Sequence, residues 1–310
     1  MIIFIESAPV TGTLNSFGKE EQIMSWVTLV FTLLLCAIPL SAGAEYATID
    51  ELANAYSDAS CKGCHAKVHN DWKSSYHSQS IVHSLGGIKN FIVVGLGQEW
   101  KQPVSKAHLM RCMSCHAPML KDATEDLAKQ VAGLIVTAVD DKDEGKKTSA
   151  KAELAKLNVN CVVCHNTMVS LEKNLVGAPR PGVYYSPAGK ASPAHKTERS
   201  PAMSTALFCG QCHGIHTPPD GDAIVCNTLY GSYQDAYRAN GGSETCQDCH
   251  MKAKNRGHKF PGAYEVDIVK DGIGLDFQAA AIRLHPGKWI PTAVVNIGLI
   301  NKAGHRIPDG

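Results

Sequence analysis

The 310-residue chain is poor in three things: aromatic side chains, net charge and long apolar runs. Phe, Trp and Tyr together make up 6% of it, so few large side chains are available to fill a core. Thirty basic and 29 acidic residues give a net charge of +1, which argues against nucleic-acid binding. One uncharged, mostly apolar run covers residues 26–40, which is short for a membrane-spanning helix of about 20 residues.

That run instead resembles the apolar part of an export signal. It is followed by Ser41-Ala42-Gly43-Ala44, an A-x-A cleavage pattern. We therefore expect residues 1–44 to be a signal peptide, with Met24 as an alternative start. An uncleaved anchor and lipidation at Cys36 are the two alternatives.

Ten of the twelve cysteines lie in five copies of Cys-x-x-Cys-His. This spacing is the attachment signature of a c-type haem, because two thiols three residues apart bond one porphyrin and the adjacent histidine binds its iron. Paired cysteines also bind zinc or act as redox dithiols, but neither chemistry requires histidine at the next position. The sequence therefore predicts five covalently bound haem c groups. The five motifs are Cys61-Lys-Gly-Cys64-His65, Cys112-Met-Ser-Cys115-His116, Cys161-Val-Val-Cys164-His165, Cys209-Gly-Gln-Cys212-His213 and Cys246-Gln-Asp-Cys249-His250.

Five haems leave about 53 residues of mature chain for each, too few for five ordinary protein cores. The scarcity of aromatic residues fits a chain in which the haem stack forms the core. About ten propionate charges would make the loaded protein acidic despite its balanced polypeptide. The predicted fold is mainly α with much irregular loop and a short β segment near the C-terminus.

The motifs begin at residues 61, 112, 161, 209 and 246, which predicts one haem per consecutive segment. We expect a pentahaem domain over 45–265 and a short β-rich segment over 266–310, truncated relative to longer relatives. The local predictions are a helix over 123–139 capped by Asp122, a charged turn over 140–147, a short helix over 151–157, a proline-rich ordered loop over 173–206, strand or short helix over 277–284, and strand over 294–300.

Nine further histidines compete for the free side of each iron, where a second imidazole favours electron transfer. Two of them share a local pattern: Gly257-His258-Lys-Phe-Pro261 and Gly304-His305-Arg-Ile-Pro308. Glycine gives backbone clearance and proline stiffens the following turn, which suits the presentation of an imidazole to a haem. We predict both histidines as distal ligands.

The first motif is followed by six residues, Trp72, four residues and His77. This layout resembles the tetrahaem cytochrome c electron carriers of ammonia oxidation, over about residues 57–250. The resemblance implies that His77 is a distal ligand to another haem and that His195, between the third and fourth motifs, is a second one. The fifth motif and the Gly-His-x-x-Pro tail depart from that family and resemble other respiratory multihaem cytochromes. His83 is our fifth distal candidate, from its place six residues after His77. His108 and His216 are close competitors, and His69 and His285 are expected to be structural.

The favoured function is electron transfer in the periplasm or at the cell exterior. The expected partners are other cytochromes, a quinol-oxidising membrane complex or a terminal reductase; membrane association is not required. The alternative is an oxidoreductase acting on nitrite, hydroxylamine or a sulfur oxyanion, which needs one haem with an open iron position. All five motifs end in histidine, whereas pentahaem nitrite reductases often have lysine there, so the carrier is favoured and no catalytic residue is assigned. Assembly into an oligomer or filament, with histidines ligating haems of a neighbouring subunit, is a third hypothesis.

Overall fold

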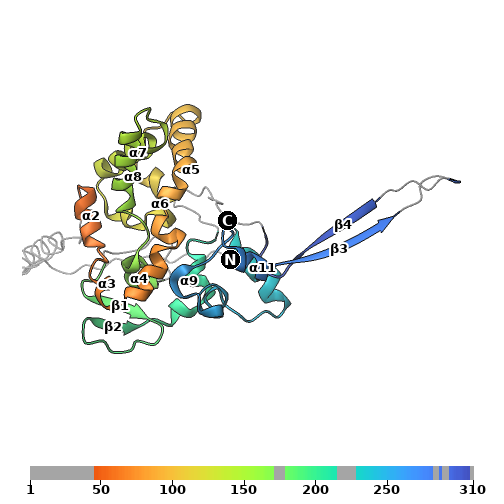
Figure 1. The fold of residues 1–310 in the computed structure, drawn as a ribbon. Helices are drawn as coiled ribbons and strands as arrows, with labels where there is room; N and C mark the ends of the chain where they lie inside the picture. Colours follow the sequence, from red (N-terminus) through yellow and green to blue (C-terminus); the bar gives the residue numbers. More distant parts are fainter. Residues whose placement is uncertain (1–44, 171–178, 215–227, 282–285, 288–292, 308–310) are drawn as a thin grey trace, which may run out of the picture. The chain divides into compact units, whose positions relative to one another are not determined.

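The computed structural model describes residues 45–170, 179–214, 228–281, 286–287 and 293–307, all within one unit, Gly43–Gly310. The predicted signal peptide lies outside the described residues. As predicted, the described chain is mainly helical, with irregular connections and a short antiparallel sheet near the C-terminus (Figure 1).

The α-helices are short except for three in the first half of the chain. They are α2 (Ile49–Ala55), α3 (Cys61–Cys64), α4 (Ala66–Lys73), α5 (Leu85–Asn90), α6 (Lys106–His116), α7 (Glu125–Asp140), α8 (Glu144–Ala155), α9 (Ala206–Gly210), α10 (Leu229–Ser232) and α11 (Val266–Gly272). Four π-helical segments are η3 (Phe91–Glu99), η5 (Val163–Thr167), η8 (Tyr233–Tyr237) and η10 (Asp248–Lys252). Short 3-10 turns are η1 (Tyr76–Gln79), η2 (Val82–Ser84), η4 (Pro118–Asp122), η6 (Met168–Ser170), η7 (Pro201–Ser204), η9 (Arg238–Asn240), η11 (Ala253–Asn255) and η12 (Gly257–Lys259).

Helix α7 was predicted in nearly the right place, but its cap differs. Thr124 is the N-cap, and its hydroxyl accepts a hydrogen bond from the backbone N–H of Leu127. The Asp122 carboxylate is engaged elsewhere, because it accepts the Tyr56 hydroxyl at 2.7 Å and the Lys121 ammonium at 2.6 Å. The predicted cap was therefore wrong by two residues.

The charged turn predicted over 140–147 is also partly helix. Asp143 caps α8 by accepting hydrogen bonds from the N–H groups of Gly145 and Lys146, so that helix begins seven residues before the predicted one. Figure 1 shows α7 and α8 side by side, with α5 beside α7.

The four strands found in the described residues form two separate pairs. Strands β1 (Val183–Ser186) and β2 (Lys196–Arg199) are parallel and lie within the predicted proline-rich loop. Strands β3 (Ile273–Ala281) and β4 (Ala293–Asn301) are antiparallel, with Leu275 opposite Leu299 and Phe277 opposite Ile297. The strand predicted over 294–300 is confirmed, and the ambiguous segment over 277–284 is strand as far as Ala281.

A polypeptide core occupies the first half of the described chain. Its buried apolar side chains run from Ile49 to Met168, and α7 contributes more of them than any other element. The sequence predicts that haem supplies much of the interior; this half of the chain also has an apolar core of its own, because its helices carry enough Leu, Ile, Val and Ala to pack against one another. In the described part after residue 179, few apolar side chains are buried: Val183, Met203, Ala206, Tyr233 and Pro261.

Truncation of a side chain in this helical core should weaken the fold. Leu154 on α8 is fully buried, so Leu154→Ala should lower the free energy of unfolding by about 3 kcal/mol through lost contacts and the cavity left behind. Denaturant titration of the haem-loaded protein, followed by circular dichroism, measures this change. Lys151→Ala, on the exposed side of the same helix, should change it by less than about 0.5 kcal/mol; equal effects would contradict the described packing.

Candidate haem-binding site

Each predicted attachment motif lies on a turn of helix. The first is α3, the second ends α6, and the fourth begins within α9. Side chains three residues apart share one face of a helical turn, so both cysteines of a motif point the same way. The N–H of His65 donates to the carbonyl of Cys61 at 2.8 Å, and the N–H of His213 to that of Cys209 at 2.9 Å, which holds the histidine one turn beyond the first cysteine.

The third and fifth motifs pass into π-helical turns. Cys164 and His165 lie in η5, and Cys249 and His250 lie in η10. Single π-helical turns are rare and occur frequently at functional sites. Here each motif histidine lies in the middle of its π-helical turn.

Backbone carbonyls fix the orientation of three motif histidines. The Nδ1 atoms of His116, His165 and His250 lie 2.9, 2.8 and 2.8 Å from the carbonyl oxygens of Ser80, Tyr185 and Pro261, respectively. A carbonyl only accepts, so Nδ1 carries the proton and Nε2 is left with its lone pair. This is the usual arrangement around a metal-binding histidine, whose second nitrogen is oriented by a hydrogen bond.

Four of the five predicted distal histidines face a motif histidine. The ring centres are 6.4 Å apart for His65 and His195, 6.2 Å for His165 and His258, 6.0 Å for His213 and His77, and 6.4 Å for His250 and His305. An imidazole nitrogen binds a first-row metal at about 2.0 Å, and the ring centre lies about 1.1 Å behind it, so two rings on opposite sides of one iron should be about 6.2 Å apart. The four separations match this spacing.

One pair differs from the others in the angle between its rings. The planes meet at 41° for His65 and His195, at 29° for His165 and His258, and at 20° for His250 and His305. The planes of His77 and His213 meet at 89°.

His83, the fifth candidate, does not face a motif histidine. Its Nε2 lies 3.1 Å from the Gln79 side-chain oxygen, and its ring packs against Tyr76 at 4.7 Å. His116, the motif histidine left without an opposite ring among the described residues, has its Nδ1 beside the hydroxyl of Ser84 at 2.9 Å as well as the Ser80 carbonyl.

The competing histidines fall into two groups. His69 packs edge-on against Trp72, and Nδ1 of His108 bonds the Ser105 hydroxyl at 2.9 Å. His216 and His285 lie outside the described residues. Within the described residues, no three His, Cys, Asp or Glu side chains gather as a metal cage, so the zinc interpretation of the cysteine pairs gains no support.

Burial favours the neutral form of two of the facing histidines, His77 and His258. It lowers the pKa of His77 to about 4, with the neighbouring His213 and His258 lowering it further. It also lowers the pKa of His258 to about 4, helped by His165. Neutral imidazole is the form that binds a metal, and the buried Nδ1 of His77 has no hydrogen-bond partner in the described part of the chain. An unsatisfied buried polar atom of this kind fits a site built for a further group.

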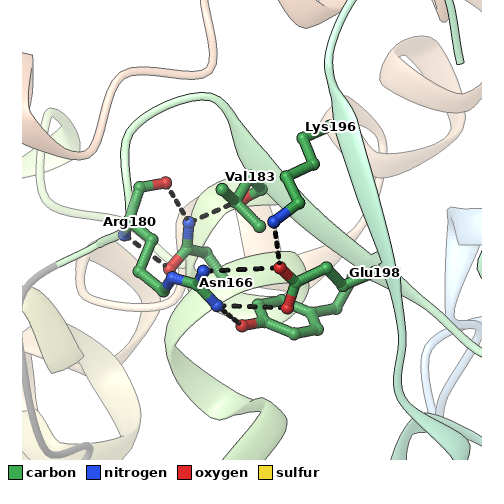
Figure 2. A network of polar contacts seen from close by, with 6 residues as sticks. Asn166, Arg180, Val183, Lys196 and Glu198 are labelled. Carbon is green, nitrogen blue, oxygen red and sulfur yellow. Dashed lines mark hydrogen bonds and ion pairs between the residues drawn. The ribbon is translucent and has the colours of Figure 1, made fainter.

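Asn166, the residue after the third motif, holds the strand that orients His165. Its side chain donates to the carbonyls of Arg180 and Val183 at 2.9 and 2.8 Å, and accepts the N–H of Arg180 at 2.9 Å (Figure 2). Arg180 and Lys196 pair with Glu198 on the exposed side of the same strands, and their hydrogen bonds lower the pKa of Glu198 to about 2. Asn166 thereby positions β1, whose Tyr185 carbonyl accepts from His165.

Sequence reasoning missed these supporting groups. The carbonyls of Ser80, Tyr185 and Pro261 are backbone atoms, and no residue type marks them. Phe260 was visible only as the apolar position of the Gly-His-Lys-Phe-Pro pattern, yet its ring contacts two of the facing histidines.

Residues 96–260 match the family of outer membrane cytochromes described as MtrC/MtrF-like, domains II/IV. The match covers more than half of the chain. The chain belongs to this family. No curated protein and no solved structure matches it.

Membership assigns the chain covalently bound c-type haem and a role in electron transport. The residues present fit that group, because thiols share a helical face, Nε2 atoms are free and facing rings are spaced for one iron. The resemblance to the ammonia-oxidation carriers is a separate expectation, which the family match does not address.

The side-chain hydrogen bonds of Asn166 with Arg180 and Val183 predict a measurable contribution to the free energy of unfolding. Asn166→Ala removes three hydrogen bonds and leaves buried backbone groups unpaired, so the free energy of unfolding of the haem-loaded protein should fall by about 2 kcal/mol. Arg180→Ala removes only exposed pairs of the same network and should have a much smaller effect. A denaturant titration compares them, and a larger loss for Arg180→Ala would contradict the assigned role of Asn166.

Proposed function

We propose that the chain is an exported pentahaem c-type cytochrome that transfers electrons between respiratory partner proteins through bis-histidine haems. The single observation that carries this proposal is the set of four facing histidine pairs. When bound, each haem supplies an iron that is reversibly oxidised and reduced by one electron. The polypeptide would bind the haems, orient their ligands and exclude water.

The ten motif cysteines would hold the porphyrins, and each motif histidine would hold an iron from one side. His195, His258, His77 and His305 would complete the sites of the first, third, fourth and fifth motifs, respectively. Two imidazoles leave no open position on an iron, which suits transfer of electrons rather than chemistry on a substrate.

Thiols of different motifs meet in three places, which supports close packing of the sites. Cys61 lies close enough to Cys161, Cys115 to Cys212, and Cys209 to Cys246 for the members of each pair to affect one another's pKa values. The first site therefore adjoins the third, the second adjoins the fourth, and the fourth adjoins the fifth.

His213 lies where several sites converge. Burial lowers its pKa, and the neighbouring imidazoles of His250, His116 and His305 lower it further. His77, which faces it, is also close enough to His258 of the third site to be affected by its charge. The fourth site is thus next to the second, third and fifth, and the order of the sites in space differs from their order in sequence.

One observation favours the oxidoreductase alternative. Among the described residues, no imidazole faces His116, and the Nε2 atom of His83 lies against Gln79. An open position at the second haem would suit a small ligand such as nitrite or hydroxylamine.

Location and partners are proposed on the family and the sequence together. The family is one of outer membrane cytochromes, and the A-x-A pattern at Ala42–Ala44 suits export. Among the described residues, no helix has the length and hydrophobicity to cross a membrane. Other cytochromes, a quinol-oxidising membrane complex or a terminal reductase are the proposed redox partners, either at the cell exterior or in the periplasm.

Removal of single histidines tests the pairing. In the purified ferric protein, His195→Ala, His258→Ala and His305→Ala should each convert one low-spin haem to high-spin, because each leaves one iron without its sixth ligand. Optical and paramagnetic resonance spectra measure the change. His83→Ala is the matched control and should leave the low-spin population unchanged.

The same spectra separate the carrier from the enzyme. A low-spin wild-type protein that does not bind nitrite or hydroxylamine supports the carrier. A high-spin haem in the wild type that binds either compound, and that His83→Ala does not alter, would contradict the simple carrier function.

A further inference from the structure

The segment Gly257–Pro261 touches three of the facing histidine pairs at once. His258 faces His165 at 6.2 Å, and the Pro261 carbonyl accepts from Nδ1 of His250 at 2.8 Å. Between these two residues, the ring of Phe260 lies 4.7 Å from the ring of His77. Five consecutive residues therefore contact the third, fourth and fifth sites.

Phe260 stands between two distal histidines that belong to different pairs. Its ring meets His77 at an interplanar angle of 80° and His258, 5.4 Å away, also at 80°. Edge-to-face contacts of this kind are the favoured arrangement of aromatic rings and resist rotation of either partner. Rotation of His77 toward the plane of His213 would break the contact with Phe260.

The backbone holds Phe260 in this place at a conformational cost. Its φ of 45° and ψ of 57° lie in the left-handed region, which a residue with a side chain adopts only at an energetic cost. Such outliers persist where the surroundings impose them, and they cluster at functional sites.

The start of the segment is fixed by α4. Gly257 has a φ of 60°, and a Cβ there would lie 2.8 Å from a carboxylate oxygen of Asp71, which Lys67 holds by an ion pair at 2.8 Å. The segment therefore cannot shift freely along the distal histidines.

We propose that Phe260 is a positioning residue that holds the imidazole of His77 crosswise to that of His213 and so makes the fourth haem site electronically distinct. This inference rests on the proposed function. Crossed imidazole planes leave two of the iron d orbitals nearly equal in energy, whereas nearly parallel planes split them. The ferric iron between His77 and His213 is therefore expected to give a strongly anisotropic low-spin resonance signal, and the three other pairs to give ordinary rhombic signals.

The experiment is paramagnetic resonance on the ferric, haem-loaded wild type and on Phe260→Leu, with haem content checked by mass. Phe260→Leu keeps an apolar side chain but removes the flat ring. The expected result is a shift of the anisotropic signal toward the rhombic form, with loss of most of its intensity and no change in haem content. Phe91→Leu is the matched control, since Phe91 packs against Trp100, and it should leave the signal unchanged.

Two further variants make every outcome decisive. Phe260→Trp retains a flat ring and should preserve the anisotropic signal, which keeps the test available if Phe260→Leu loses haem. His77→Ala should abolish that signal. An intact signal in Phe260→Leu together with its loss in His77→Ala would overturn the role of Phe260 alone. An intact signal in His77→Ala would overturn the pairing with His213, and the role of Phe260 with it.

Discussion

Much of the described structure serves one arrangement: imidazole rings from distant parts of the chain lie opposite one another with their centres 6.0–6.4 Å apart. The nearest pair in sequence, His250 and His305, spans 55 positions, and the farthest, His77 and His213, spans 136. Motif turns, carbonyl hydrogen bonds and the β1–β2 pair all act to keep Nε2 atoms aimed inward. Neutral imidazoles in low-polarity surroundings cost little to bury and bind iron without first losing a proton.

The chain uses two different kinds of interior. Helices α5, α6, α7 and α8 contribute to an ordinary apolar core, which packs against cysteines of the second, third and fourth motifs. After residue 179, buried apolar side chains are scarce in the described segments, and hydrogen bonds and histidine contacts take their place. We therefore expect folding of this later part to depend on haem attachment more strongly than folding of the helical part.

The sequence predicts side-chain chemistry here better than it predicts what orients that chemistry. The spacing of cysteine and histidine identifies the motifs. The Gly-His-x-x-Pro pattern predicts His258 and His305 as ligands, because glycine gives the backbone clearance and proline stiffens the turn that follows. His83 was predicted from its place six residues after His77. In the structure its Nε2 atom lies 3.1 Å from the side-chain oxygen of Gln79, four residues earlier. Asp122 was the predicted N-cap of α7, but its carboxylate accepts a hydrogen bond from the hydroxyl of Tyr56, which is distant in sequence. The sequence does not mark the backbone carbonyls that accept from the histidines, nor the angle between the Phe260 ring and the rings of His77 and His258. Both are set by tertiary packing.

The most direct test of the histidine pairing is a density map of the haem-loaded protein at a resolution that shows axial ligands. We expect four irons to lie between His65 and His195, His165 and His258, His213 and His77, and His250 and His305, with the fourth site adjoining the second, third and fifth. An iron ligated on its free side by any other residue at one of these four sites would contradict this pairing.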